Sequence, residues 1–277
     1  MKKIIIATDF SESSESALAY ATFLAKQFDA ELLLIHTYFP VVPLDANLAY
    51  DTIAPTTIQE EMIKSFEKQL HEVEVSIKAK HIKVSAEIIV GSVSSGIATF
   101  AKEKNADLII VGKTPDPSFF DRLAGSTATN LIGNTSVPVL IVPANNHKPS
   151  FKHIVYGTEL ESEEKNVLKQ LFTFAKDLKA KVSLIKIDAD FEPNVQDDNQ
   201  ILADLSKSFA KEDFTFTAVK ASNVSEGLLE AAHTHKADLL VLARHHHNFL
   251  TEIVNPSKSK EIINKTDIPV LVYDIEA

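Results

Sequence analysis

The sequence contains no cysteine and only seven glycines among its 277 residues. Without cysteine the chain cannot form disulfides, use a thiol as a nucleophile or build a cysteine-based zinc site. None of its apolar runs reaches the roughly 18 residues that a membrane-spanning helix needs. Disulfide-stabilised and membrane-spanning proteins are therefore not expected classes for this chain.

Basic charge is also scarce, because 28 Lys and Arg face 38 Asp and Glu and give a net charge of −10. About half of that charge lies in each half of the chain, so neither half has the basic character that binds nucleic-acid phosphates. The segment Met1–Asp9 lacks the long apolar stretch and the cleavage site of a signal peptide. We expect a cytoplasmic protein with no nucleic-acid and no membrane partner.

Three familiar catalytic motifs are missing from the sequence. It contains neither a Walker A sequence nor the dinucleotide Gly-x-Gly-x-x-Gly. The segment Gly91–Gly96 is one residue too long for a Gly-x-Ser-x-Gly nucleophile elbow. The sequence thus gives little support for an enzyme.

The chain repeats itself. Residues 106–112 read ADLIIVG and residues 237–243 read ADLLVLA, a shift of 131, and the same shift places VPVL at 137–140 on IPVL at 268–271. We interpret this as one duplicated and fused α/β unit, with domains at 1–145 and 150–277 and a linker within 143–152.

Apolar, β-branched runs alternate with helix-period segments in both copies. Strands are predicted at 3–8, 31–36, 84–90, 108–111 and 137–142, and again at 153–157, 182–187, 214–219, 239–242 and 270–273. Helices are predicted from Ser11 or Ser13 to about Phe28, at 59–79, at 95–104, from about 126, at 163–179 and at 225–235. The alternation predicts an α/β fold of two tandem, doubly wound, five-stranded parallel sheets.

The first copy is longer than the second. Asp9 falls on Glu159 at a shift of 150 rather than 131, so the first copy has about 19 additional residues, which lie within Tyr38–Thr57. This segment is either a lid or partner-binding loop, or a tolerated surface insertion.

The first copy also has the features of a phosphate site. Gly112 ends a strand and would let a ligand approach the backbone, and Gly125-Ser126 would present N–H groups at a helix N-terminus. Asp9 follows the first strand, at the sheet edge where open α/β folds bind ligands. The alternative is that the two glycines merely permit tight turns.

Together these features resemble the universal stress protein family in its tandem form. The resemblance covers nearly the whole chain and is carried by Ala7-Thr8-Asp9-Phe10-Ser11, by Gly112, by Gly125-Ser126 and by Val137-Pro138-Val139-Leu140. It implies a Rossmann-like fold of the adenine nucleotide alpha hydrolase type, with halves related by a pseudo-two-fold axis. It also implies that Val139–Val142 pairs with Val270–Tyr273.

The resemblance further implies that the first half binds ATP or a related adenine nucleotide, with Mg²⁺. Ala7 and Asp9 would face the base and ribose, and Thr37 would line the adenine pocket. The residues implied for the ribose and phosphates are Val111, Gly112, Gly125, Ser126 and Thr127.

One departure from the family pattern bears on this site. Pro115 stands where the family has a second glycine, and proline has no N–H to donate and cannot adopt positive φ. Asp116 and Asp121 add negative charge, which Lys113 and Arg122 could offset. Nucleotide binding by the first half therefore remains an open prediction.

The second copy has lost more of the pattern. Gly112, Pro115 and Gly125 correspond to Ala243, His246 and Pro256, and Asp9 corresponds to Glu159. A phosphate cradle needs free N–H groups and close approach, so we expect no similar nucleotide site in this half. We expect its role to be pairing with the first half.

His245, His246 and His247 are consecutive and are weak candidates for a transition-metal site. The alternative for them is a solvated or pocket-filling loop.

Three hypotheses for function remain. The first is a regulatory stress-response module whose nucleotide occupancy biases the 38–57 segment or the domain interface. The second is a slow ATP hydrolase or phosphotransferase, for which no general base is evident. The third is a scaffold, or a metal-binding stress protein, without nucleotide. A further homodimer and a protein partner of unknown identity remain open.

Overall fold

The computed structural model describes residues 1–39, 53–113, 127–144, 146–189, 198–244 and 256–275. The first half contains β1 (Lys3–Ala7), α1 (Glu12–Phe28), β2 (Glu31–Tyr38), α2 (Ile53–Lys78), β3 (Val84–Val90), α3 (Val93–Lys104), β4 (Leu108–Lys113), α5 (Thr127–Asn134) and β5 (Val139–Pro143). The second half contains β6 (His153–Gly157), the 3₁₀ turn η2 (Ser162–Glu164), α6 (Lys165–Leu178), β7 (Lys181–Ala189), α7 (Asp198–Ser208), β8 (Phe214–Ala221), α8 (Val224–Thr234), β9 (Leu239–Arg244), α9 (Pro256–Lys265) and β10 (Val270–Asp274).

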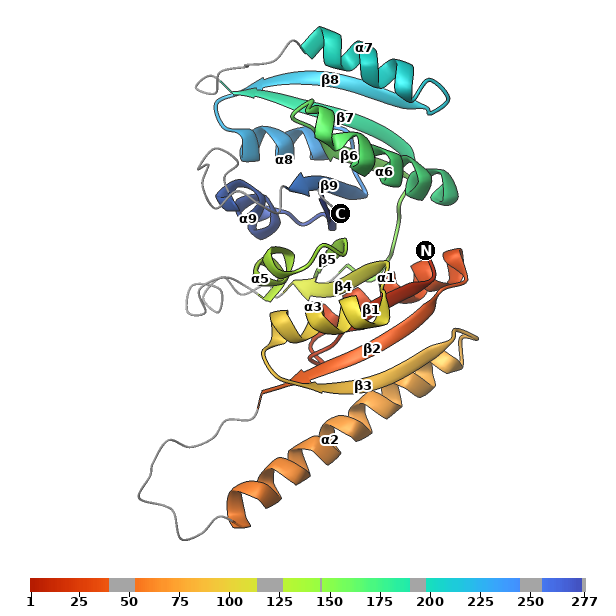
Figure 1. Cartoon of the computed structure of the whole chain (residues 1–277), viewed down its shortest axis with the longest axis vertical. Coiled ribbons are helices and arrows are strands. Elements are labelled where there is room, and N and C mark those ends of the chain that lie inside the picture. Colours follow the sequence, from red (N-terminus) through yellow and green to blue (C-terminus); the bar gives the residue numbers. More distant parts are fainter. Residues whose placement is uncertain (40–52, 114–126, 145, 190–197, 245–255, 276–277) are drawn as a thin grey trace.

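All ten strands form one sheet, in the order β3-β2-β1-β4-β5-β10-β9-β6-β7-β8 (Figure 1). Each half is a five-stranded parallel sheet with the same internal order, as the repeat predicted. The halves meet where β5 and β10 pair antiparallel, with Val270 opposite Ile141 and Val272 opposite Val139. The predicted pairing of the two last strands is confirmed.

Helices cover both faces of the sheet, so the molecule has three layers. Residues of α1, α2, α6 and α7 form one apolar cluster with one face of the strands, and residues of α3, α5, α8 and α9 form the other. In β1, Ile4 and Ile6 join the first cluster and Ile5 joins the second, all without solvent exposure. Burial on both faces is the reason these strands appear in the sequence as continuous apolar runs.

The additional residues of the first half lengthen one helix. Helix α2 has 26 residues, whereas its counterpart α7 has 11. It begins at Ile53, six residues before the predicted start, and extends beyond the edge of the sheet (Figure 1). The rest of the insertion, residues 40–52, lies outside the described residues. Both predictions for it, a lid or partner-binding loop and a tolerated surface insertion, therefore stay open.

Candidate functional site

The strand order reverses between β1 and β4, and ligands of open α/β sheets bind in the crevice beside the carboxyl ends at such a point. Ile6 pairs with Ile110, so the next residues, Ala7 and Val111, are neighbours, and they contribute to the same apolar cluster. Thr37 is half-buried and lies two residues beyond the β2 partner of Ala7. The structure therefore gathers these three predicted residues at one edge of the sheet.

Asp9 follows β1 at the same edge and is exposed. Its Oδ1 accepts hydrogen bonds from the Ser11 N–H at 3.0 Å and from the Ser11 hydroxyl at 2.5 Å. The Ser11 hydroxyl also lies 2.8 Å from that of Ser13, and Ser11 is the N-cap of α1, one of the two caps that the sequence predicted. The carboxylate is thus oriented by the start of α1 and remains open to solvent.

The sequence suggested that a ligand approaches Gly112 closely, but in the structure another part of the backbone does so. A Cβ at this position would lie 2.4 Å from both the carbonyl carbon and the oxygen of Ser13. The backbone that approaches Gly112 is therefore that of helix α1, so glycine is needed there even without a ligand. The contact joins the end of β4 to the segment that orients Asp9.

Replacing Gly112 with alanine is expected to lower the free energy of unfolding by about 1–3 kcal/mol, because backbone atoms must move to admit the methyl group. Gly133→Ala is the matched control, since a Cβ there has no atom within 4 Å and Gly133 lies in helix α5. Urea unfolding of the two variants measures the difference. Equal stability of both variants would show that the Ser13 contact does not constrain residue 112.

Several predicted residues lie outside the described part of the chain. These are Gly125 and Ser126, together with His245, His246 and His247. Thr127 is the first residue of α5, at the predicted place for a helix N-terminus. The phosphate contacts assigned to these residues remain predictions. Within the described ranges, no group of three His, Asp or Glu is placed to hold a metal ion.

The loop after the first strand has the same geometry in both halves. Phe10 and Leu160 both have left-handed backbones, with φ of 62° and 59°. Each N–H donates to the hydroxyl of the threonine two residues earlier, Thr8 or Thr158, at 3.0 Å. Left-handed backbone is costly for bulky side chains, and its presence in both halves shows that it belongs to the fold rather than to one ligand site.

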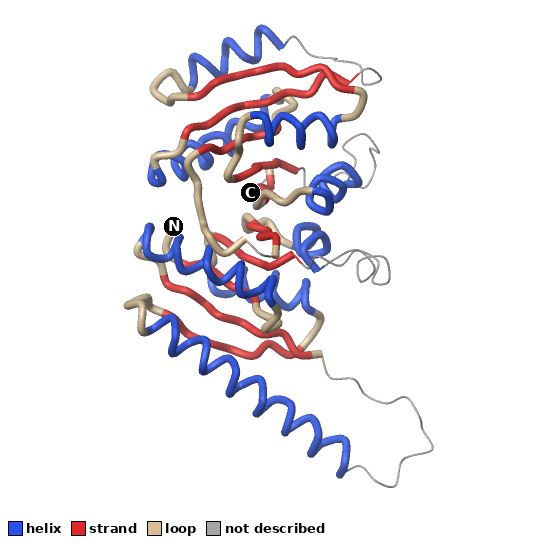
Figure 2. The backbone as a smooth tube through the Cα atoms, turned by 180° about the vertical axis from the view of Figure 1, so that it is seen from behind, coloured by secondary structure: helices blue, strands red, loops and turns tan. Residues whose placement is uncertain are grey.

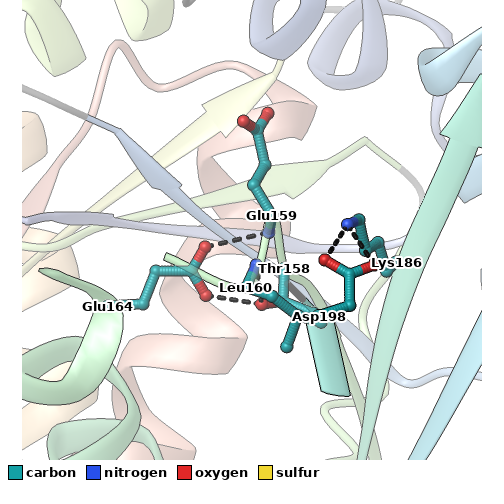
Figure 3. Close-up of polar contacts among 6 residues, drawn as sticks. All are labelled: Thr158, Glu159, Leu160, Glu164, Lys186 and Asp198. Carbon is teal, nitrogen blue, oxygen red and sulfur yellow. Dashed lines mark hydrogen bonds and ion pairs between the residues drawn. The ribbon is translucent and has the colours of Figure 1, made fainter. Parts of the chain in front are cut away.

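The halves differ in the residue that contacts the threonine hydroxyl of this loop. In the first half, the Thr8 hydroxyl contacts the hydroxyl of Ser14 at 3.1 Å. At a shift of 150, Glu164 takes the place of Ser14, and its carboxyl accepts hydrogen bonds from the Thr158 hydroxyl at 2.6 Å and the Glu159 N–H at 2.9 Å (Figure 3). The side chain of Glu159 points away from this carboxyl (Figure 3).

Glu164 is 3% exposed, and this burial raises the pKa of its carboxyl to about 7, although the hydrogen bond from Thr158 acts in the opposite direction. Glu164 is not among the site residues predicted from the sequence. It could have been noticed from the sequence, because at the shift of 150 Glu164 corresponds to Ser14, which lies in the first turn of α1.

A second substitution lies beside it. Lys186 corresponds to His36, whose Nδ1 lies 2.8 Å from the Thr8 carbonyl. The Lys186 amino group instead contacts both carboxylate oxygens of Asp198 in α7, each at 2.5 Å (Figure 3). At these two positions the second half therefore has Glu164 and Lys186 where the first half has Ser14 and His36.

Lys113 and Arg244, which end β4 and β9, reach across the interface between the halves. The Lys113 amino group donates to the carbonyls of Asn264 and Thr266, at 2.7 and 2.8 Å, at the end of α9. Arg244 donates to the carbonyl of Thr135, just after α5, at 2.9 Å. We call Lys113 and Arg244 the cross-domain cations.

The cross-domain cations occupy equivalent positions, because a shift of 131 carries Lys113 onto Arg244 and Thr135 onto Thr266. Burial lowers the pKa of both groups. Each lies near the negative end of a helix dipole of the other half. Asp116 and Asp121 lie outside the described residues, so the prediction that Lys113 offsets their charge stays a prediction.

Comparison with known proteins shows to which family a chain with this fold belongs. The model of the universal stress protein family matches residues 1–143 and again residues 150–274, so the chain belongs to that family.

Curated relatives match about half of this chain. A universal stress protein of Methanocaldococcus jannaschii is 35% identical over 145 residues, which cover 51% of this chain and 81% of that protein. Universal stress protein G of Salmonella typhimurium is 28% identical over 151 residues, which cover 51% of this chain and 98% of that protein.

Among solved structures, a universal stress protein from Archaeoglobus fulgidus superposes over 99% of this chain and 98% of its own, with a TM-score of 0.78 and 18% identity. This likeness supports the fold of the whole chain, both halves included. Among the described residues, no helix is both long and apolar enough to cross a bilayer.

Proposed function

We propose that the first half binds one adenine nucleotide, with Mg²⁺, at the carboxyl ends of β1 and β4, and that the protein acts as a regulatory module. The observation that supports this most is the convergence of Ala7, exposed Asp9, Val111 and Gly112 at the point where the strand order reverses. Family membership supports the ligand class, since the resemblance implies adenine nucleotides for members of this kind.

The second half is proposed to bind no nucleotide. Pro256 replaces Gly125 and has no N–H to donate, and Glu164 places a carboxyl beside the first loop where the first half has a serine hydroxyl. With a pKa of about 7, that carboxyl is partly ionised at neutral pH. A negative charge in a poorly solvated position opposes binding of a phosphate, so one site per chain is expected.

The cross-domain cations give the proposed site a route to the second half. Lys113 directly follows Gly112 and is bound to the last carbonyls around α9. A ligand that moves the end of β4 would therefore change contacts of the other half, which is how occupancy would alter the interface.

The test compares two matched variants. Asp9→Ala is expected to weaken ATP binding at least about tenfold, the usual effect of losing a hydrogen bond to a charged group. Glu159→Ala changes the equivalent carboxylate of the second half and is expected to leave the affinity unchanged. Isothermal titration of ATP with Mg²⁺ into the full chain measures both. Equal effects of the two changes would contradict the proposal, and accumulation of ADP would favour the hydrolase hypothesis.

A further inference from the structure

Helices α1 and α2 cover the same face of the first half of the sheet (Figure 2). Between them and the strands β1 and β2 lies a pocket of about 90 Å³, which we call the small pocket. Its apolar walls are made by Ile6, Leu18, Leu34 and Val73. An engineered protein cavity of roughly 150 Å³ accommodates benzene, so the small pocket has room for a molecule of about four or five non-hydrogen atoms.

Two hydroxyl groups, those of Thr8 and Ser14, also line the small pocket. The Thr8 hydroxyl accepts a hydrogen bond from the Phe10 N–H at 3.0 Å and donates one to the Ser14 hydroxyl at 3.1 Å. The Ser14 hydroxyl in turn donates to the carbonyl of Ser11 at 2.8 Å. A hydroxyl oxygen has two lone pairs, so the Ser14 oxygen can accept one further hydrogen bond.

The second half fills the equivalent space with its own side chains. At the shift of 150, Ile6 corresponds to the larger Tyr156, which has no solvent exposure. Ser14 corresponds to Glu164, which is also buried. Burial raises the pKa of the Tyr156 hydroxyl well above its ordinary value, and the neighbouring Glu164 carboxyl raises it further. These two side chains therefore share the space that is open in the first half.

The carboxyl of Glu164 binds to the first loop of the second half. It accepts hydrogen bonds from the Thr158 hydroxyl at 2.6 Å and from the Glu159 N–H at 2.9 Å (Figure 3). Beyond its Cα, the Glu164 side chain has the carbon skeleton of propionic acid. It is therefore an internal example of how a short acid fits this space.

The first half has the same loop but no carboxyl of its own at this place. The Asp9 N–H corresponds to that of Glu159, and the residue after each has the same left-handed backbone. Because Ser14 has no carboxyl, the Asp9 N–H lacks the partner that the Glu159 N–H has. One donor, the Asp9 N–H, and one acceptor, the Ser14 oxygen, are therefore available to a ligand at this end of the small pocket.

The charges around the small pocket disfavour an anion. Glu15 lines it and is exposed, whereas the second half has Lys165 at the corresponding position. Asp9 is a second exposed carboxylate at the same end. Even in the second half, burial raises the pKa of the Glu164 carboxyl to about 7, so this environment favours the neutral form of a carboxyl group.

Titratable groups of β2 and α2 that lie next to the small pocket have partners of their own. On β2, the His36 Nδ1 lies 2.8 Å from the carbonyl of Thr8. On α2, Glu74 pairs with Lys78 at 2.9 Å. Repulsion by the two exposed carboxylates is therefore expected to dominate for a negatively charged ligand.

We propose that the small pocket binds a short-chain carboxylic acid in its neutral form. The carbonyl oxygen of the acid accepts a hydrogen bond from the Asp9 N–H, its O–H group donates to the Ser14 oxygen, and its alkyl chain packs against the apolar walls. The proposal does not depend on nucleotide, because these walls belong to the cluster on the α1 and α2 side of the sheet. Ala7 and Val111 of the proposed nucleotide site belong to the cluster on the other side.

The probes are propionic acid and propionamide, its neutral analogue, each titrated into the full chain without nucleotide. Methyl NMR locates the ligand, and saturable shifts are expected for the methyl groups of Ile6, Leu18, Leu34 and Val73. The affinity for total propionic acid is expected to be about tenfold higher at pH 6 than at pH 7, because about ten times more of it is neutral. The affinity for propionamide is expected to be the same at both pH values.

Variants that fill the small pocket supply the matched test. Ser14→Glu gives the first half the carboxyl of the second and is expected to weaken propionamide binding at least about tenfold, which corresponds to about 1.4 kcal/mol. Val73→Phe fills the pocket from α2 and is expected to have the same effect, so the test does not rest on one variant. Ser65→Glu adds a glutamate to an exposed position of α2 that does not line the pocket, and no effect is expected.

Asp9→Ala separates the small pocket from the proposed nucleotide site. It keeps the backbone N–H, so propionamide is expected to bind it as tightly as the wild type. Loss of propionamide binding in Asp9→Ala would place the ligand in the nucleotide site and overturn the proposal. Absence of saturable binding, shifts confined to other methyl groups, or full affinity in both Ser14→Glu and Val73→Phe would overturn it as well. Equal affinity for propionic acid at pH 6 and pH 7 would show that the anion binds, which also contradicts it.

Discussion

Replacing Arg244 with methionine is expected to lower the free energy of unfolding by about 3–5 kcal/mol, the usual effect of removing one partner of a buried ion pair. The reason is Asp274, whose side chain is 3% exposed and pairs with Arg244 at 3.1 Å. The change also removes the hydrogen bond to the Thr135 carbonyl in the other half. Urea unfolding followed by circular dichroism measures the loss.

Two controls show whether the buried charge is the cause. Adding Asp274→Asn to Arg244→Met is expected to restore much of the stability, because the buried negative charge that Arg244 offsets is then removed as well. Lys265→Met removes a cation that pairs with Glu261 on the surface, and no measurable change is expected. If Arg244→Met were as stable as Lys265→Met, the Arg244–Asp274 pair would not stabilise the fold as a buried ion pair does.

Glu164→Gln is expected to remove a fall in stability between pH 5 and pH 8. The folded pKa of about 7 lies above the unfolded value of 4.5, so the folded state holds a proton that the unfolded state releases. Stability from this group is therefore present at low pH and is lost as the pH rises through the folded pKa. The shift corresponds to about 2–3 kcal/mol over this range.

The variant is best compared with wild type at each pH. Its advantage is expected to be small at pH 5 and close to the full 2–3 kcal/mol, roughly, at pH 8, since glutamine resembles the protonated carboxyl. Glu163→Gln changes the exposed neighbouring carboxyl and is expected to follow the wild type. A constant difference between Glu164→Gln and wild type at all pH values would mean that Glu164 does not titrate in this range.

Much of the fold could be predicted because the sequence repeats and the strands are buried on both faces. Ile4–Ile6 and Leu108–Val111 appear in the sequence as apolar runs for that reason. Helices α7 and α9 were not predicted, because each buries few residues. Leu205 is the one described residue of α7 that is buried, and in α9 the buried pair is Ile262 and Ile263.

The site was harder to predict. The position of Asp9 and Gly112 at the ends of strands could be predicted from the sequence, but the Ser13 contact at Gly112 depends on where α1 packs. Glu164 was missed because glutamate is rarely buried. The contacts of Lys113 with the second half were missed because their partners lie about 150 residues away in the sequence. Contacts between the halves depend on how the two domains pack against each other. The spacing of apolar residues along the sequence predicts single helices and strands but not this packing.

The number of adenine nucleotides bound per chain tests the central claim most directly, namely that duplication has left one competent site and one that cannot bind. Native mass spectrometry of the full chain with ATP and Mg²⁺ measures it, with Asp9→Ala in parallel. The account predicts one nucleotide per chain, lost in Asp9→Ala. Two nucleotides per chain, none, or one that persists in Asp9→Ala would contradict it.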